Sequence, residues 1–251
     1  MVLFNLFKSV MGDSSGDEPP QRCTAVIVAA GRGERMRQDT SKQFIKLIGR
    51  PVISYTLEVF EQCKMVDEII IVTREQDLMD MRDVVEAFGI DKTAKIVIGG
   101  DKRQDSVYNG LREIGYDTST ILIHDGARPF VTVEELETLI KETGKCRAAA
   151  LGMPVKDTIK KVDKDNIVTE TPDRETLWAV ATPQAFTYDV IMNAYEAAMK
   201  DKFYGTDDCS LVERTGQSVK IVPCSNENIK ITTPEDIFVA ESILESRGDE
   251  W

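Results

Sequence analysis

Basic side chains are concentrated in one short segment of an acidic chain. Between Gly31 and Arg50 there are six basic and two acidic residues, whereas the whole chain of 251 residues has a formal net charge of −12. The segment follows an apolar stretch and contains two glycines, Gly31 and Gly33. Free backbone N–H groups beside concentrated positive charge are what a bound polyphosphate requires. The segment therefore predicts a binding site for a nucleoside triphosphate.

Arg35 and Lys42 are the candidate catalytic cations of this segment. Transfer of a phosphoryl or nucleotidyl group leaves little covalent chemistry to the protein, so positioning and charge stabilisation supply the rate. An exposed lysine usually serves only solubility. The neighbouring cations and the sequence Ser41-Lys42-Gln43 favour a catalytic role for Lys42.

The two glycines alone are not specific, because a bare Gly-x-Gly is equally compatible with an ordinary tight turn. A dinucleotide-binding fingerprint needs a third glycine where Met36 stands, and an acidic residue where Thr73 and Arg74 end the second apolar run. A Walker A sequence is also absent. These departures favour a triphosphate held by a loop and cations over a dinucleotide.

Asp125 directly follows the apolar run 121–124. Magnesium takes one or two carboxylates and completes its shell with phosphate oxygens and water, so a strand-end carboxylate beside a polyphosphate is a natural Mg²⁺ ligand. The alternative is a turn aspartate that caps the next segment. Arg128, three residues on, is placed to contact a second anion. His124 is the only histidine, which excludes a Ser-His-Asp triad or a multi-histidine metal site, and we expect it to be packed within the strand.

Apolar runs alternate with helical patterns through most of the chain, as in α/β proteins. We expect strands at 24–30, 68–73, 95–98, 120–124, 148–155 and 219–223, and helices at 51–62, 75–88, 106–114, 134–143, 188–199, 208–214 and from 234 onward. Strands that are apolar throughout imply a mostly parallel sheet covered by helices on both faces. Ligands bind at the carboxyl ends of such strands. Suggestive residues follow the strands at 31–36, at 99–101 with Arg103 and Ser106, at 124–128 and at 228–230.

The segment 156–171 has a different pattern. Its residues from Thr158 to Thr169 alternate as in a hairpin with a turn near 163–166. Because an exposed two-stranded hairpin is only marginally stable alone, we expect a protruding β-arm at approximately 156–172 that packs on a partner. A homodimer that exchanges these arms is a natural solution.

The composition and the first residues bear on partners, on cellular compartment and on the N-terminal segment. Hydrophobic residues make up 42% and charged residues 29%, as in soluble globular domains, and the acidic balance argues against nucleic-acid binding. Five scattered cysteines without a Cys-x-x-Cys pair favour the cytoplasm, and no apolar run reaches the roughly 18 residues of a membrane span. We expect residues 1–22 to form a disordered extension, because 12–20 are rich in Gly, Ser, Asp and Pro. The apolar residues 1–7 precede Lys8, which is the wrong order for a signal peptide.

Nine sequence blocks occur in order between residues 23 and 245: AAGRGERM, SKQF, GGDKRQDSV, HDGARPF, PVKDTIK, DRETLW, TPQAF, GTDD and NIKITTPED. Together they resemble the 2-C-methyl-D-erythritol 4-phosphate cytidylyltransferases of the non-mevalonate isoprenoid route. The resemblance implies a Rossmann-like, doubly wound sheet of the nucleotide-diphospho-sugar transferase type. It also implies one cytidylyltransferase domain over residues 23–251, with the β-arm as an excursion.

The resemblance implies transfer of CMP from CTP to 2-C-methyl-D-erythritol 4-phosphate. The acceptor phosphate would attack the α-phosphorus in line, with loss of pyrophosphate and formation of 4-diphosphocytidyl-2-C-methyl-D-erythritol. Arg35 and Lys42 would stabilise the five-coordinate phosphorus. Asp125 would hold Mg²⁺, which offsets the repulsion between two anionic reactants. The nucleotide-binding residues that the resemblance implies are Ala29, Ala30, Gly31, Gly33, Gly100, Asp101, Ser106 and Gly126.

For the acceptor, the resemblance implies a second set of residues. Arg174 and Lys230 would align the acceptor phosphate for attack and so belong with the catalytic residues. Thr158 and Arg174 flank the arm, so the resemblance implies that they serve the neighbouring subunit and that the homodimer is required for catalysis. The complete acceptor-binding set is Arg128, Thr158, Arg174, Thr206 and Lys230.

Two alternatives stay open. Ribitol 5-phosphate cytidylyltransferases share the nucleotide half, although the segment 173–178 resembles the methylerythritol enzymes better. A catalytically silent nucleotide-binding regulatory subunit could also use the same fold; the presence of Arg35, Lys42 and Asp125 argues against it. One local departure is Ser41, which stands where the family more often has proline and makes the loop less rigid. Glu227 receives no role.

Overall fold

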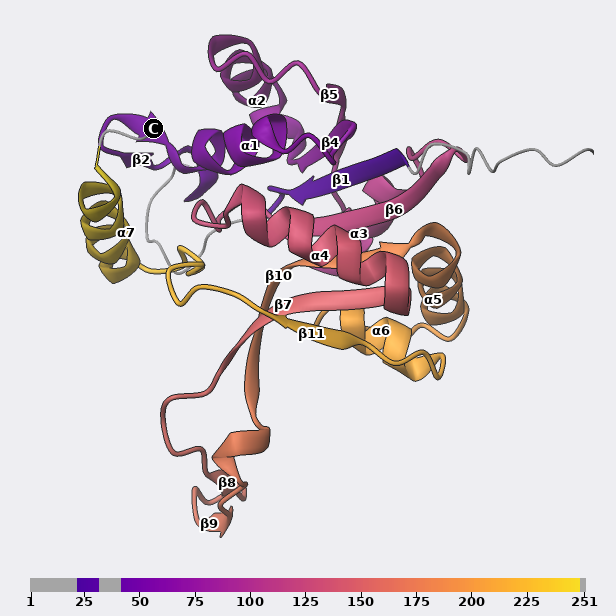
Figure 1. Cartoon of the computed structure of the whole chain (residues 1–251), viewed down its shortest axis with the longest axis vertical. Helices are drawn as coiled ribbons and strands as arrows, with labels where there is room; N and C mark the ends of the chain where they lie inside the picture. Colours follow the sequence, from indigo (N-terminus) through magenta and orange to yellow (C-terminus); the bar gives the residue numbers. More distant parts are fainter. Residues whose placement is uncertain (1–21, 32–41, 249–251) are drawn as a thin grey trace, which may run out of the picture.

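A seven-stranded sheet forms the centre of the computed structural model, which describes residues 22–31 and 42–248 (Figure 1). Every neighbouring pair is parallel except the two pairs that involve β10. The expected mostly parallel sheet is confirmed. In order across the sheet, the strands are β11 (Lys220–Pro223), β7 (Ala148–Pro154), β10 (Trp178–Thr187), β6 (Thr118–Asp125), β1 (Arg22–Val28), β4 (Glu68–Thr73) and β5 (Thr93–Ile98).

Helices cover both faces of the sheet because its central strands are apolar on both sides. Ile27 and Ile71 join the core under α1 (Val52–Gln62), α2 (Leu78–Ala87) and α4 (Val133–Cys146). Val26 and Ile70, one residue away in each strand, join the opposite core under α3 (Arg103–Leu111), α5 (Tyr188–Lys200) and α6 (Asp208–Arg214). This alternation is the period of two expected for a strand. It gives the doubly wound arrangement.

A third, smaller core lies beside α1. Leu47 of β2 (Lys46–Leu47) and Phe130 pack there with α7 (Pro234–Arg247), and β3 (Arg50–Pro51) pairs with β2. Ile231 is fully buried in this core, and its N–H donates to Ala127 O at 2.9 Å. These contacts fix the backbone next to Lys230.

The strand β10 was not predicted. It runs antiparallel between β6 and β7, at the centre of the sheet. Antiparallel neighbours need no crossover helix, so no helical pattern separates β7 from β10 to announce a new strand. The strand also contains Pro183, which removes a ladder hydrogen bond, and its register shifts between Val180 and Gln184.

The expected arm is present between β7 and β10. It contains β8 (Lys161–Val162), β9 (Val168–Glu170) and the short helix η4 (Arg174–Thr176), and it projects away from the body (Figure 1). The predicted turn is confirmed, because Asp163 Oδ1 accepts from the N–H groups of Asp165 and Ile167, each at 2.9 Å. All residues from 156 to 171 are exposed.

Some boundaries differ from the expected ones. Arg22, which we assigned to the N-terminal extension, is instead the first residue of β1, where its guanidinium pairs with Glu68 at 2.6 Å and with Asp117 at 2.7 Å. The helix α3 begins at Arg103 and not at Ser106. The short helix η2 (Lys42–Phe44) was not predicted, and the helix expected at 75–88 is divided into η3 (Glu75–Asp77) and α2. No helix among the described residues is both long and apolar enough to cross a membrane.

Candidate functional site

A pocket of about 810 Å³ opens at the carboxyl ends of β1, β4, β5 and β6. The chain passes outward from β1 to β4 and β5, and then returns to the other side of β1 with β6. The pocket therefore lies where the strand order reverses, which is the usual ligand site of a doubly wound sheet. Eight residues predicted for the site line it, namely Ala29, Ala30, Gly31, Gly100, Asp101, Ser106, Asp125 and Lys230.

Three of the predicted nucleotide-loop residues cannot be placed in the same way. Gly33 and Arg35 lie outside the described residues. The backbone of Lys42 begins η2, but its side chain is likewise not described. Their roles stay predictions.

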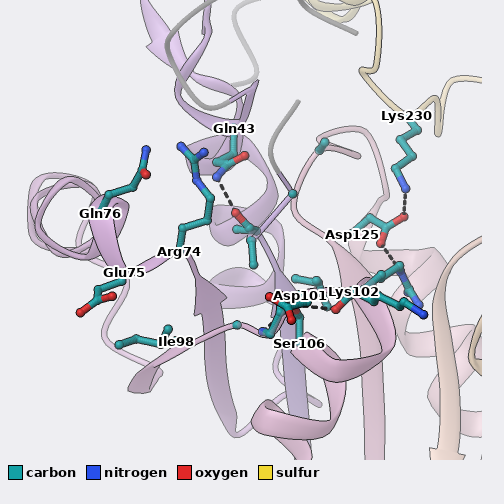
Figure 2. Close-up of a pocket in the computed structure, with 18 residues that line it drawn as sticks. Gln43, Arg74, Glu75, Gln76, Ile98, Asp101, Lys102, Ser106, Asp125 and Lys230 are labelled. Atoms are coloured by element: carbon teal, nitrogen blue, oxygen red, sulfur yellow. Dashed lines mark hydrogen bonds and ion pairs between the residues drawn. The ribbon is translucent and has the colours of Figure 1, made fainter. Parts of the chain in front are cut away.

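The turn after β5 brings bare backbone to the pocket wall. A Cβ at Gly99 would lie 2.5 Å from Ala30 Cβ, and one at Gly100 would lie 2.5 Å from Asp105 Cβ, so both positions require glycine. Ser106 Oγ accepts from Gly100 N–H at 3.1 Å and donates to Lys102 O at 3.1 Å, as Figure 2 shows. The turn is thus held in one conformation at the wall of the pocket.

On the opposite wall of the pocket, Asp125 is bonded by two basic side chains. Its Oδ2 accepts from Lys230 Nζ at 2.6 Å and its Oδ1 from Arg103 Nε at 3.0 Å (Figure 2). Arg128 Nε lies 4.0 Å from Oδ2. Burial favours the neutral acid, but the charges and hydrogen bonds of Arg103 and Lys230 outweigh it and hold the pKa of Asp125 well below its usual value. The carboxylate is therefore ionised throughout the physiological range.

Arg103 was named among the suggestive strand-end residues but received no role, and the structure shows that it connects two carboxylates. Its Nη1 and Nη2 bind Asp208 at 3.1 Å and 2.9 Å, while its Nε binds Asp125. Asp208 is 1% exposed and also accepts from the Tyr195 hydroxyl at 2.6 Å. The sequence signal was its position just after a strand end; its partner on α6 is 105 residues away and has no local signature.

The wall near β4 contains a second unpredicted group. Gln43 Nε2 donates to Ala29 O (Figure 2). It also donates to Asp77 Oδ2 at 3.4 Å. Arg74 binds the same carboxylate through Nε at 2.6 Å and Nη2 at 3.0 Å. Gln43 thus fastens η2, and with it the backbone of Lys42, to the end of β1. Its position beside Lys42 in the SKQF block was the available signal.

His124 is packed in its strand, as expected. It is fully buried, with Nδ1 at 3.1 Å from Thr182 Oγ1 and Nε2 at 3.0 Å from Arg128 O. Burial lowers the pKa of the imidazole to about 4, so the ring is neutral at physiological pH. These contacts orient the strand end that presents Asp125.

Five predicted residues do not line the pocket. Gly126 is buried behind it, where a Cβ would lie 2.6 Å from Ile53 Cδ1, so this glycine is needed for packing. Arg128 is mostly buried beside Asp125, and its Nη1 donates to Asn228 O at 2.7 Å. Thr206 is exposed on the loop before α6. Thr158 and Arg174 are exposed on the arm, and Arg174 Nη1 donates to Lys156 O at 3.0 Å.

The residues present can hold a metal ion only together with a ligand. No group of three or more His, Cys, Asp or Glu side chains suited to a metal occurs within 22–31 and 42–248. Asp125 lines the pocket as an ionised carboxylate, and each of its oxygens has a second lone pair beyond the bonds from Lys230 and Arg103. One carboxylate completed by phosphate oxygens and water is an ordinary Mg²⁺ site.

Comparison with known proteins identifies the family. The family model for 2-C-methyl-D-erythritol 4-phosphate cytidylyltransferase matches residues 23–246. Proteins of that name from Pelotomaculum thermopropionicum and Halalkalibacterium halodurans are 46% and 48% identical, over 90% and 88% of this chain and 95% and 96% of their own lengths.

Solved structures agree with the fold. The 4-diphosphocytidyl-2C-methyl-D-erythritol synthase of Anaerococcus prevotii is 34% identical with a TM-score of 0.81, over 90% of this chain and 97% of that one. The 2-C-methyl-D-erythritol 4-phosphate cytidylyltransferase of Francisella tularensis is 30% identical with a TM-score of 0.75, over 89% and 100%. The Rossmann-like fold and the resemblance are thereby confirmed: the chain belongs to the 2-C-methyl-D-erythritol 4-phosphate cytidylyltransferase family, a family of nucleotidyltransferases.

Proposed function

We propose that the chain transfers CMP from CTP to 2-C-methyl-D-erythritol 4-phosphate in isoprenoid precursor biosynthesis. An oxygen of the acceptor phosphate forms a bond to the α-phosphorus of CTP while the bond to the β-phosphate oxygen breaks. The products are 4-diphosphocytidyl-2-C-methyl-D-erythritol and pyrophosphate. The observation that carries the proposal is the pocket at the strand-order reversal, in which a glycine turn faces the Asp125–Lys230 pair, in a chain of this family.

CTP is the proposed ligand of the β1 and β5 ends. The cytosine and ribose would lie against Gly100, Asp101 and Ser106, which line the pocket at the end of β5. The triphosphate would extend along Ala29, Ala30, Gly31 and Gly33, where charge and free N–H groups favour an anion. Gly126 would act indirectly, by supporting the strand ends from behind.

Charge stabilisation is the proposed source of the rate. Arg35 and Lys42 would bind the oxygens of the α-phosphorus as negative charge develops on them. Lys230 would align the acceptor phosphate, since its ammonium already projects to the pocket wall. Asp125 would hold Mg²⁺ together with triphosphate oxygens, and the ion supplies positive charge between two anionic reactants.

The acceptor is the proposed ligand of residues from two subunits. Arg128, Thr206 and Lys230 would come from one chain, and Thr158 and Arg174 from the arm of the other chain of a homodimer. Support for the exchange comes from the arm, where Ile167 is 63% exposed and Val168 is 53% exposed. Apolar side chains on a thin projection are stabilised by a covering partner. We place this reaction in the cytoplasm.

The experiment offers CTP with each of several polyol phosphates and measures pyrophosphate release. We expect turnover with 2-C-methyl-D-erythritol 4-phosphate to exceed that with ribitol 5-phosphate. Preference for ribitol 5-phosphate would favour the alternative enzyme. No pyrophosphate release with any acceptor would favour the silent nucleotide-binding subunit, and release without an acceptor would show hydrolysis of CTP instead of transfer. Lys230→Met should abolish turnover. The control is Lys220→Met, which removes an exposed lysine of β11 that pairs with Glu142, and it should leave turnover unchanged.

A further inference from the structure

The first turn of α3 contacts two regions that are far apart in the sequence. Lys102, Arg103 and Ser106 line the nucleotide pocket. Gln104, between them in the chain, instead reaches the loop 201–207 that joins α5 to α6. This α5–α6 loop carries Thr206. The same turn therefore meets both the proposed CTP site and the loop of a proposed acceptor residue.

Both polar atoms of the Gln104 carboxamide bond to the backbone of this loop. Its Nε2 donates to Phe203 O at 2.9 Å, and its Oε1 accepts from Gly205 N–H at 3.0 Å. The side chain is 7% exposed. Two bonds from one planar group fix both the distance and the direction of a backbone segment. Because they are buried, they are also costly to leave unmade.

The α5–α6 loop is fixed on the other side of Thr206 by a second amide. Gln184 of β10 donates from Nε2 to Asp207 Oδ2 at 2.8 Å and accepts from Asp208 N–H at 3.1 Å. Gly205 leaves no space for a side chain, since a Cβ there would overlap Ser210 Oγ. Thr206 is thus the exposed residue between two anchored neighbours. Its hydroxyl has a defined position only while both anchors hold.

A further contact joins the loop to the pocket wall. Lys102 Nζ lies 3.4 Å from the centre of the Tyr204 ring, and the Tyr204 hydroxyl donates to Asp105 Oδ1 at 3.3 Å. Lys102 itself lines the pocket. The α5–α6 loop is therefore held against the first turn of α3 by side-chain contacts as well as by Gln104.

We propose that Gln104 is a positioning residue that couples the nucleotide-binding wall to acceptor binding by holding Thr206. The inference rests on the proposed function, in which Thr206 contacts 2-C-methyl-D-erythritol 4-phosphate. Gln104 does not touch the substrates. Its loss leaves the Gly99–Gly100 turn and Asp125 in place, because Ser106 and Arg103 hold them independently. Acceptor binding is therefore lost selectively.

The experiment compares Gln104→Met with Gln217→Met. Methionine keeps the length of the side chain and removes both hydrogen bonds. Gln217 is a matched control, because its Nε2 also donates to backbone, to Ser218 O at 3.0 Å, beyond the opposite ends of the strands. Gln104→Met should raise KM for the acceptor by about 3- to 10-fold. The Kd of CTP, measured by calorimetry, should stay within about twofold, and Gln217→Met should change neither.

A double-mutant cycle shows whether Gln104 acts through Thr206. Thr206→Val should raise the acceptor KM in the wild-type background and raise it much less in the Gln104→Met background. Additive effects, an equal loss of CTP and acceptor binding, or no change in either constant would overturn the proposal. Should Gln104→Met fail to fold, Gln104→Glu keeps the acceptor for Gly205 N–H and serves in the same cycle.

Hydrogen exchange separates this proposal from the proposed function. The Gly205 amide should exchange faster in Gln104→Met than in wild type. Slow exchange in both would show that Gln104 does not hold the α5–α6 loop. A wild-type chain that shows the protected Gly205 amide but no turnover with 2-C-methyl-D-erythritol 4-phosphate would instead overturn the proposed function, and with it the coupling to the acceptor.

Discussion

The pocket and the arm hold their charged residues in opposite ways. Around the pocket, Arg103 is fixed by Asp125 and by Asp208, which is 1% exposed, and Asp208 is fixed in turn by Tyr195. On the arm, Arg174 is exposed and bonded to a carbonyl 18 residues away on the same projection. A buried hydrogen-bonded network fixes the positions of its side chains before a ligand binds. An exposed side chain is fixed only when a ligand or another protein contacts it. Under the proposed function, the nucleotide half of the site would be formed within one chain, and the arm would contribute only on contact with a second subunit.

The largest effect should come from a charge needed only in the transition state. Lys42→Ala should lower kcat roughly 10²- to 10³-fold, as for the loss of one preorganised donor, with little change in the KM for CTP. Steady-state kinetics measures both constants. Lys46→Ala, an exposed lysine of β2 in the same basic segment, is the control and should change neither. A change confined to KM would contradict the role assigned to Lys42.

The two regions should differ in how they respond to an isosteric loss of charge. Asp208→Asn removes the buried partner of Arg103 and should lower the free energy of unfolding by about 3 kcal/mol. Asp163→Asn in the exposed turn of the arm keeps its acceptor oxygen and should lower it by less than about 0.5 kcal/mol. Urea unfolding of both variants measures the difference. Equal losses of unfolding free energy in the two variants would contradict the contrast between a pocket fixed by buried ion pairs and an arm with exposed charges.

Exchange of arms predicts complementation between two inactive variants. Arg174→Ala should impair turnover while CTP binding, measured by calorimetry, stays nearly intact. Mixed with Lys42→Ala after dissociation and reassociation, it should recover about a quarter of wild-type activity, because half of the dimers then contain one intact site. Lys161→Ala, an exposed cation elsewhere on the arm, should behave as wild type. No recovery in the mixture would contradict exchange.

The smallest effect should come from the first residues. Deleting residues 1–21 should leave kcat and both KM values within about twofold of the full chain. Arg22 is kept because it begins β1 and pairs with Glu68 at 2.6 Å. Loss of activity on this deletion would show that the segment takes part in the site.

Local sequence carries much of the fold and of the nucleotide site. The apolar runs around Ile27, Ile70 and Ile123 predict buried parallel strands, because only a sheet covered on both faces accepts them. Strand-end residues such as Asp125 and Ser106 could be named for the same reason, since parallel strands bring their carboxyl ends to one edge.

Contacts between distant segments could not be predicted in this way. The pairs Arg103–Asp208 and Gln104–Gly205 join residues about 100 positions apart, and neither partner has a local pattern that names the other. The strand β10 was missed because an antiparallel return needs no helix and tolerates Pro183 beside an irregular register. Arg174 and Thr158 were expected to serve the neighbouring subunit, and they do not line the pocket of their own chain; their role stays a prediction.

The root of the arm gives β10 a further consequence. The strand that carries the chain back from the projecting hairpin is also the neighbour of β6, and its Thr182 hydroxyl accepts from the N–H of Asp125 at 3.0 Å. A displacement of the arm would therefore be transmitted to the strand that contacts the backbone of Asp125. One strand therefore both connects the arm to the sheet and helps to position Asp125, so a partner bound to the arm would act on a strand that contacts this carboxylate directly.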